Sequence, residues 1–566
     1  MKRIIQIIAL VLPATILVAQ PTDEKNIGQV TIDVTARYRA NIKEAVKISG
    51  QPTFADSTTK KINVKYEVPN RPVDLTFNPQ PIPPLRISGA RLPRLPHNFI
   101  KVGMGMYVTP EVELFIGNTR NRDFQWGVRA SHFSTQSGVT GIAFDNNALS
   151  RNQIGFDGKK LMRDLRFNFG VEGNYNTIRY YGVPEAAADI DSLDYGEKAP
   201  GQQYKHAKAY VEFSQRGQRR PGVFRNAGLA YNIMGDQYGA LEHDLDFSNT
   251  WLVKAKEEDL YIDLKAQYQS TGFDSVVNPR LFLIGFIPHI SSNWGKVNFT
   301  VGMNFSVTSG PADEYEITAD NKSFFFAPYF KISTTLVERV LTFDAGWVGD
   351  VNNTSMWDLS QMNPYINPRV ELAASGYNKI YANLRGILAR NLNYRIGGGY
   401  NILRNKALFY RSPDLPLPDQ IAGFNVVYDD IKVLNLQGGI EWSADGPLDV
   451  LAYGEYNQYN TSTQEHAWHL PELRTGLRLK YTWKEKIAFS TDWQYVGERW
   501  AHTGDETWYA QKLDGYLDAQ FGVQYYYNDN LNAYLNVTNL LSQNYQEWMG
   551  YPVQRIRFNL GLSYKF

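Results

Sequence analysis

The sequence predicts an all-β protein, a large closed transmembrane antiparallel β-barrel of about 22 strands, with roughly 16 to 24 as the range. Three observations predict this fold class. Apolar residues recur at every second position through most of the chain, the N-terminus looks like an export segment, and the last alternating segment ends on the aromatic residue Phe566. A β-strand is the only regular element with a period of two.

The alternating segments are amphipathic strands. They are clear at residues 165–171, 297–307, 477–483 and 517–525. Because successive strand side chains point to opposite faces, each segment has one apolar and one polar face. A soluble β-sandwich or propeller would share this pattern. Strands long enough for a tilted crossing of ~9–11 residues, Tyr and Trp at their ends, and short turns alternating with longer loops favour the barrel.

The N-terminus predicts export. Lys2 and Arg3 precede a short apolar run, and Ala19 precedes a polar segment, so residues 1–19 are interpreted as a secretory signal peptide. A buried N-terminal helix is the alternative. The apolar run is shorter than the ~20 residues of a membrane-spanning helix. We therefore expect an exported protein of a Gram-negative cell outer membrane, in contact with its lipids.

Composition excludes several function classes. The 58 basic and 57 acidic residues leave a net charge of +1, which argues against a nucleic-acid partner. The absence of cysteine excludes thiolate metal sites and cysteine catalysis. None of the eight histidines lies in a recognisable nucleophile or acid motif. The prediction is a protein that is not an enzyme and has no cofactor.

Residues 20–97 differ in composition from the rest of the chain, because the stretch from Pro69 to Pro96 is rich in proline. Such composition favours extended structure without a packed core. This segment is expected to be periplasmic or to enter the lumen, where Arg86, Arg91 and Arg94 could pair with carboxylates; a disordered linker is the alternative. Residues 98–566 are assigned to the barrel.

The last strand resembles the C-terminal sequence by which the barrel-insertion machinery recognises outer-membrane barrels. Its apolar face carries the four residues of this insertion signal, Leu560, Leu562, Tyr564 and Phe566. If this strand runs inward, the turns near Asp529, Glu485, Asp445 and Arg390 are periplasmic. Outside loops are then expected at residues 405–430, 461–470, 496–511 and 545–552. The same count places the long segment 350–366 at the periplasmic end, so either this segment is a periplasmic excursion or a strand near it has been missed.

Two of the outside loops predict a candidate metal site. Glu465, His466 and His469 lie in one loop, and His502, Asp505 and Glu506 lie in the next. Converging imidazoles and carboxylates can bind zinc. The alternative is that these are ordinary surface residues, and no metal is assigned.

The outside loops also contain aromatic residues that suggest either ligand contacts or membrane-interface anchors: Trp468, Trp500, Trp508, Tyr509, Tyr545 and Trp548. The polar strand faces mix both signs of charge, so the sequence predicts no ion preference for the lumen. The residues on which this rests are Arg166, Arg474, Arg478, Lys480, Arg555, Arg557, Glu172, Glu212 and Asp518.

Two motifs resemble those of TonB-dependent receptor barrels. Residues 536–545 match the pattern N-x-x-N-L-x-x-x-x-Y and are followed by Gly550-Tyr551-Pro552, and residues 363–368 look like the NP-x-L-x-P turn. The ending is similar to outer-membrane proteins of Bacteroidota, and the short N-terminal region is similar to a subgroup without a plug domain. The resemblance implies transport or uptake with a periplasmic or surface partner protein. The alternative is a non-transporting structural subunit of a secretion or assembly complex.

Overall fold

The computed structural model describes most of the chain from residue 98 onward. The described residues are 98–118, 120–142, 144, 147–182, 199–216, 223–255, 258–273, 280–309, 322–338, 340–389, 391–411, 423–443, 446–504 and 510–566. The expected signal peptide and Pro-rich segment lie outside them, as do Arg390, Asp445, Asp505, Glu506, Trp508 and Tyr509.

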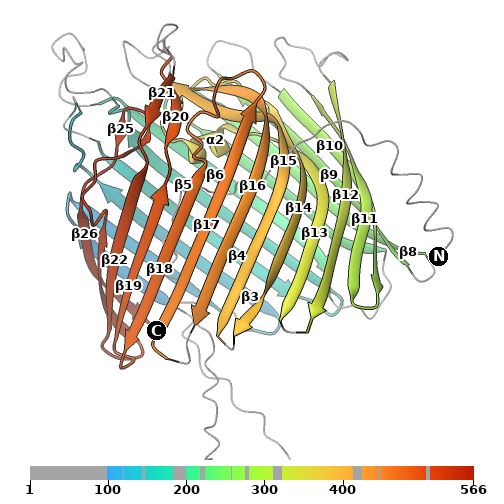
Figure 1. Ribbon diagram of the computed structural model, residues 1–566, viewed down its shortest axis with the longest axis horizontal. Helices are drawn as coiled ribbons and strands as arrows, with labels where there is room; N and C mark the ends of the chain where they lie inside the picture. Colours follow the sequence, from blue (N-terminus) through green and yellow to red (C-terminus); the bar gives the residue numbers. More distant parts are fainter. Residues whose placement is uncertain are drawn as a thin grey trace, which may run out of the picture. The chain divides into compact units, whose positions relative to one another are not determined.

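Twenty-two antiparallel strands form a closed barrel, as the sequence predicted (Figure 1). The first eleven are β1 (Phe99–Gly105), β2 (Thr109–Asn118), β3 (Phe124–Thr135), β4 (Leu149–Leu161), β5 (Leu165–Arg179), β6 (Gly201–Gln215), β7 (Phe224–Gly235), β8 (Leu241–Ala255), β9 (Glu258–Gly272), β10 (Arg280–Trp294) and β11 (Val297–Ser309). The others are β12 (Lys322–Val337), β13 (Leu341–Asn353), β14 (Ala374–Ala389), β15 (Leu392–Arg411), β16 (Phe424–Ser443), β17 (Leu448–Thr461), β18 (Leu473–Trp483), β19 (Ile487–Val496), β22 (Tyr516–Tyr526), β23 (Leu531–Thr538) and β26 (Arg557–Lys565).

Two pairs of short strands and one short helix lie in the connections. β20 (Arg499–His502) pairs with β21 (Ala510–Leu513), and β24 (Gln546–Trp548) pairs with β25 (Tyr551–Pro552). A short helix, α2 (Met356–Met362), joins β13 to β14. Ser355 caps it by accepting a hydrogen bond from the amide of Asp358. In the described part of the chain, no helix is long and apolar enough to span a membrane.

The first and last strands close the ring. β1 pairs with β26 from Phe99 opposite Lys565 to Gly105 opposite Asn559. Closure leaves no strand edge facing lipid, where an unpaired backbone group would be costly. On the lumen side, the Tyr534 hydroxyl lies against Gly103 and Gly561, and a Cβ at either position would collide with it. These glycines therefore provide the space for a tyrosine that packs across the seam.

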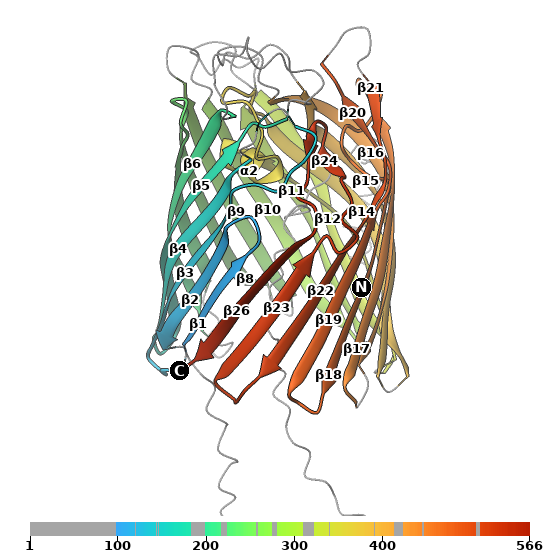
Figure 2. The same cartoon turned by 90° about the vertical axis from the view of Figure 1, so that its left-hand side faces the viewer.

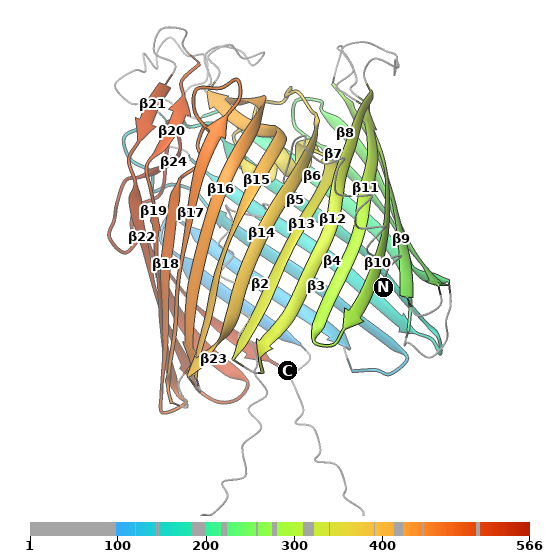
Figure 3. The ribbon, with the colours of Figure 1, turned by 45° about the vertical axis from the view of Figure 1, so that its right-hand side comes forward.

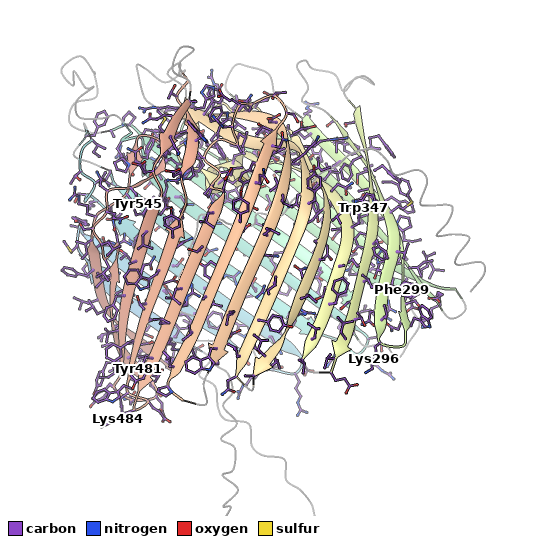
Figure 4. All side chains as sticks on the ribbon, viewed as in Figure 1. Lys296, Phe299, Trp347, Tyr481, Lys484 and Tyr545 are labelled. Carbon is purple, nitrogen blue, oxygen red and sulfur yellow. The ribbon has the colours of Figure 1, made fainter. Side chains whose placement is uncertain are left out.

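The two faces of the wall differ as the period of two predicts. Apolar side chains on the outer face are exposed, including Ile154 and all four residues of the insertion signal: Leu560, Leu562, Tyr564 and Phe566. Residues of opposite parity face the lumen, where Arg129 pairs with Asp157 at 2.7 Å. Figure 4 shows Lys296, Tyr481 and Lys484 near the rim of the short turns, and Tyr545 toward the opposite end. The outer face is therefore a lipid-facing surface with polar residues at its boundary.

The long and short connections lie at opposite ends of the barrel (Figure 2). The C-terminus lies at the end of the short turns, including 484–486 and 527–530. The expected position of residues 350–366 was wrong. β14 runs without interruption from Ala374 to Ala389, so a single crossing separates this segment from the turn at 390, and it belongs to the long-loop end. No undetected strand is needed to explain it.

A second expectation is corrected at β15 and β16. Each strand contains 20 residues, so most of the predicted loop 405–430 is strand, and only 412–423 connects the pair. The wall is high on this side (Figure 3). By contrast, β1 contains 7 residues and β23 contains 8. The barrel rim is therefore uneven, being lowest at the seam.

Candidate functional site

The connection between β13 and β14 folds into the barrel mouth. We call residues 354–373, which include α2, the loop bridge (Figure 1). Its two ends meet where the amide of Thr354 donates to the carbonyl of Ala373 at 3.2 Å. Met356, Leu359 and Ile366 are fully buried. A connection with such a core is a packed element, unlike an ordinary solvated surface loop.

Glu242 of β8 anchors the start of the loop bridge. Its carboxylate accepts hydrogen bonds from the amides of Met356 (2.7 Å) and Trp357 (3.4 Å), at the beginning of α2. The side chains of Gln269 and Thr271 on β9 donate to the same carboxylate at 3.0 and 3.2 Å. Glu242 is 2% exposed. A buried carboxylate needs such donors to remain ionised, so this anchor depends on the strand wall and on α2 together.

The neighbouring strands bind the bridge through aromatic side chains. The imidazole of His206 on β6 stacks on Trp357, with ring centroids 4.3 Å apart and planes 8° apart. The hydroxyl of Tyr204 donates to the carbonyl of Pro364 at 2.9 Å. The hydroxyl of Tyr180, which follows β5, donates to the carbonyl of Ile366 at 2.7 Å. Each hydroxyl supplies the hydrogen-bond donor for a buried backbone carbonyl that lies outside a helix or strand.

The far side of the bridge joins β16. The amide of Asn367 donates to the carbonyl of Phe424 at 2.8 Å, and the amide of Phe424 donates to the carbonyl of Tyr365 at 2.9 Å. Nine strands separate β6 from β16 on one side of the ring and eleven on the other. These strands are therefore nearly opposite each other. The loop bridge crosses the barrel from one wall to the other.

The connection 539–556 packs against the bridge. Tyr551 stacks on Tyr365 with ring centroids 3.8 Å apart, and Tyr181 meets both rings. The Tyr181 hydroxyl donates to the carbonyl of Pro552 at 3.1 Å. The guanidinium of Arg411 donates to the carbonyl of Gly182 at 2.7 Å. Several loops thus share one buried core at the mouth.

The two motifs that carry the resemblance meet in this core. Tyr365 belongs to the Asn-Pro turn, and Tyr551 belongs to the Gly-Tyr-Pro sequence, 186 positions later in the chain. The motif at 536–545 also has a local role, because Asn539 donates to the carbonyls of Gln543 and Gln554 at 2.7 and 2.9 Å. The sequence motifs therefore include Tyr365 and Tyr551, but they do not show that these two residues are in contact.

The three candidate metal-binding histidines have separate environments. His466 stacks on Trp500 with centroids 4.2 Å apart, and its Nε2 lies 3.5 Å from a carboxylate oxygen of Glu465. Nδ1 of His502 accepts a hydrogen bond from the amide of Gly504 at 2.9 Å. Within the described ranges, His, Asp and Glu side chains form no group of three that could hold a metal ion.

His469 is a structural residue. Its Nδ1 lies 3.2 Å from the carbonyl of Phe409, and its Nε2 lies 3.4 Å from the amide of Met549, so both ring nitrogens serve packing contacts between loops. Burial and the nearby charge of Arg499 lower the pKa of His469 to about 3. The ring is therefore neutral at pH 7, donates from Nδ1 and accepts at Nε2, and has no lone pair left for a metal.

Of the four outside aromatics that the structure describes, three pack into a buried loop cluster or against a neighbouring ring, whereas Trp500 is 37% exposed. Trp468 is 1% exposed and belongs to a buried loop cluster, and Trp548 packs on Phe409 with centroids 5.2 Å apart. Tyr545 stacks on Tyr516 at 3.8 Å. The sequence shows aromatic content but does not distinguish an exposed ring from one that packs between loops.

Glu242, Tyr180 and Tyr204, which hold the bridge, were not singled out from the sequence. Their partners are backbone groups of a loop that lies more than a hundred residues away. Backbone amides and carbonyls are the same in every sequence, so the sequence of the loop gives no sign of these contacts. Only the inward course of residues 354–373 reveals the role of these side chains.

Comparison with known proteins identifies the architecture. No protein-family model matches the chain, and no curated protein sequence does. Solved structures do match. The FrpB iron transporter from Neisseria meningitidis superimposes with a TM-score of 0.62 at 11% identity, covering 84% of this chain and 82% of that one. The chain has the fold of the outer-membrane receptor and transporter barrels.

Two further structures show the same fold. The siderophore receptor PirA from Acinetobacter baumannii gives a TM-score of 0.62 at 8% identity, covering 84% of this chain and 81% of that one. The copper transporter OprC gives 0.61 at 12% identity and covers 84% of each chain. At these identities the likeness establishes the barrel fold alone, and it transfers no ligand.

Proposed function

We propose that this chain is a transport protein of the outer membrane in which the loop bridge controls access to the barrel lumen from outside. The observation that supports this proposal is the course of residues 354–373 from the β6–β8 wall to β16. A solute entering a barrel with this loop arrangement must pass the bridge or displace it. Transporter and receptor barrels share the fold, which supports the same function class.

The bridge is suited to reversible opening. It is held by hydrogen bonds to Glu242, Tyr180 and Tyr204, by one stretch of backbone pairing at Phe424, and by the packing of its buried apolar and aromatic side chains. Individual bonds of this kind contribute about 1 kcal/mol each. A ligand that offers equivalent contacts can compensate for their loss. Access loops of this kind move on microsecond to millisecond timescales.

The test is single-channel conductance of the purified full chain in planar bilayers. The variant replaces residues 356–366 with a Gly-Ser linker of equal length. We expect the native chain to be mostly closed and the variant to show a large, stable conductance. A second variant without residues 21–97 separates any block by the N-terminal segment from block by the bridge. If the bridge variant and the double variant both remain closed, the transport proposal is wrong.

A structural subunit of an outer-membrane secretion or assembly complex is the second candidate. The dense packing of several loops at the mouth favours it, because a permanently closed barrel could act as a scaffold. Closed channels in all variants, with co-purification of envelope partner proteins, would support this candidate. We further propose that residues 1–19 direct export, that residues 20–97 form a separate segment, and that the barrel-insertion machinery recognises the last strand.

A further inference from the structure

The outer side of the wall formed by β4 to β8 carries a groove near its long-loop end. The groove has a volume of about 510 Å³, within the range of roughly 300 to 1,000 Å³ that is typical of ligand pockets. The outward-facing side chains that border it include those of Ile154, Tyr175, Lys205, Ala207, Ile233 and Leu241. Figure 2 shows β4, β5 and β6 side by side in this part of the wall.

The strand alternation shows that the groove opens away from the lumen. Lys205 and Ala207 share the parity of Val211 and Phe213, the exposed residues of β6, so their side chains point outward. His206, which lies between them, faces the loop bridge inside the mouth. The pairing of β6 with β5 and with β7 shows no register shift here. The groove therefore belongs to the lipid-facing surface.

The floor of the groove is formed where side chains are missing. Gly173 of β5 lies opposite Ala207 of β6, and Gly235 of β7 lies opposite Lys205. A Cβ at Gly173 would meet only a methyl group of Ile154, at 3.5 Å, and a Cβ at Gly235 would meet no atom closer than 3.6 Å. The space above both glycines is therefore open.

A glycine toward the short-turn end of the same wall is different. A Cβ at Gly158 of β4 would lie 2.4 Å from the ring of Phe169, which already occupies the space above this glycine. Lys160 lies two positions further along the outward face of β4. An outward lysine therefore lies beside a filled surface at that end of the wall, whereas Lys205 lies beside an open one.

A row of directly paired polar residues borders the groove: His132, Asn152, Tyr175 and Lys205. Nδ1 of His132 lies 2.6 Å from the side-chain oxygen of Asn152, and the Asn152 side chain donates to the carbonyl of Tyr175 at 2.8 Å. The Tyr175 hydroxyl donates to Gln203 at 3.2 Å. The next row toward the short turns is small or apolar, and consists of Ala130, Ile154, Gly173 and Ala207. The boundary between the apolar band and the polar rim therefore runs along the groove.

The Lys205 ammonium differs from the other polar groups in this row. It forms no hydrogen bond and no ion pair within 4 Å with any residue in the described ranges. A second cation, Arg179 on the outward face of β5, lies over Gly201 nearer the rim and donates to the carbonyl of Ala199 at 3.1 Å. In the described part of the chain it has no carboxylate within 4 Å. The outward rim above the groove is therefore positively charged.

We propose that this groove binds an acyl chain of a phosphate-bearing lipid in the outer leaflet, and that Lys205 binds the phosphate of its head group. The long loops mark the outside end of a bacterial barrel, so a lipid at this height belongs to the outer leaflet. A lysine stem lies along apolar surface while its ammonium reaches the polar boundary, where anionic head groups attract it. A phosphate oxygen accepts charge-assisted hydrogen bonds from such a cation.

The open floor at Gly173 and Gly235 explains why the lipid would be held at this position and not elsewhere along the wall. It lets one chain lie closer to the strands, so that more apolar surface is buried. This lipid site is independent of transport. It shares with the proposed function only the placement of the barrel in the outer membrane.

The experiment is native mass spectrometry of the full chain in non-ionic detergent with dimyristoyl phosphatidic acid. We expect the native chain to retain one such lipid, and to retain dimyristoyl phosphatidylcholine, whose phosphate charge is balanced by choline, several-fold less. Lys205→Gln should weaken retention of phosphatidic acid about fivefold, because it removes one cation beside the head group. The matched control Lys160→Gln removes an outward lysine that lies beside the filled surface, and should retain the lipid like the native chain.

Gly173→Leu tests the groove separately from the charge. Its Cβ meets no close atom, and its side chain fills the floor, so retention should fall about fivefold although Lys205 is unchanged. Heat-modifiable gel migration checks that each variant is folded. Native retention with no preference for phosphatidic acid would overturn the proposal, as would native-like retention in folded Gly173→Leu or an equal loss in Lys160→Gln.

Two other occupants of the groove would give different results. A dimer of the native chain that is lost in Gly173→Leu would assign the groove to a second copy of this chain. The segment 184–197 contains five acidic residues. Lipid retention that appears only after this segment is replaced by a Gly-Ser linker would assign the groove to the segment. Either result would overturn the lipid site.

Discussion

The anchor at Glu242 leads to a quantitative prediction for the substitution Glu242→Gln. The native carboxylate accepts four hydrogen bonds, from Gln269, Thr271 and the amides of Met356 and Trp357. The amide side chain of glutamine has nearly the same shape but no charge and only one acceptor oxygen. The variant therefore weakens the attachment of α2 to the wall without creating a cavity.

The magnitude follows from the three bonds of 3.2 Å or less. Charge-assisted hydrogen bonds are about twice as strong as neutral ones, which contribute about 1 kcal/mol each, so the loss is at most about 3 kcal/mol. Burying a neutral amide costs less desolvation free energy than burying a carboxylate, so part of the lost hydrogen-bond energy is offset. We expect a net effect of about 1.5 kcal/mol, which is roughly a tenfold increase in the population of the detached bridge.

The assay is amide hydrogen exchange on the full chain in detergent. The amides of Leu359 and Asn363 donate within α2 at 3.0 and 2.9 Å and report on bridge attachment. In Glu242→Gln they should exchange about tenfold faster, because local opening limits their exchange. The control is Glu212→Gln on β6, a carboxylate whose partner is Asn168 at 3.0 Å and which lies near the short-turn end. Exchange of α2 within twofold of native, in a folded Glu242→Gln barrel, would refute the role assigned to Glu242.

Four further outcomes are expected. Tyr180→Phe removes one hydroxyl from a bridge carbonyl, so the same α2 amides should exchange about fivefold faster, in line with a bond of ~1 kcal/mol. Gly103→Ala places a Cβ against the Tyr534 hydroxyl at the seam and should lower the melting temperature of the barrel measured by heat-modifiable gel migration; adding Tyr534→Phe should restore part of the loss. The folded pKa of His469, about 3, lies below its ordinary value of 6.5, so protonation favours the opened loop and stability falls as pH decreases from about 6.5 toward 3. Once the intrinsic pH dependence of exchange is divided out, the protection factors of the amides in residues 462–472 should therefore be lower at pH 4.5 than at pH 7, and His469→Gln should remove this difference in protection. Deletion of Phe566 should reduce the fraction of exported chain recovered as folded barrel in outer-membrane fractions, without changing the level of the exported chain.

The barrel could be predicted because its determinants are local. Lipid requires an apolar residue at every second position, and this periodicity is visible in single segments such as 297–307. Strand number followed from counting such segments. The wrong position predicted for residues 350–366 has a physical reason. This connection contains buried apolar residues such as Leu359 and Ile366, so its sequence resembles neither an alternating strand nor a polar turn.

The sequence alone therefore determined the fold class and the residues of the lipid-facing surface, since both depend on neighbours one or two positions away. Tertiary structure decided the functional features. Ring closure places β6 and β16 on nearly opposite sides of the barrel, so that one connection can contact both. It also places the backbone of residues 354–373 within reach of Glu242 and Phe424. These contacts depend on which strands face each other across the barrel, a relation that no local pattern contains.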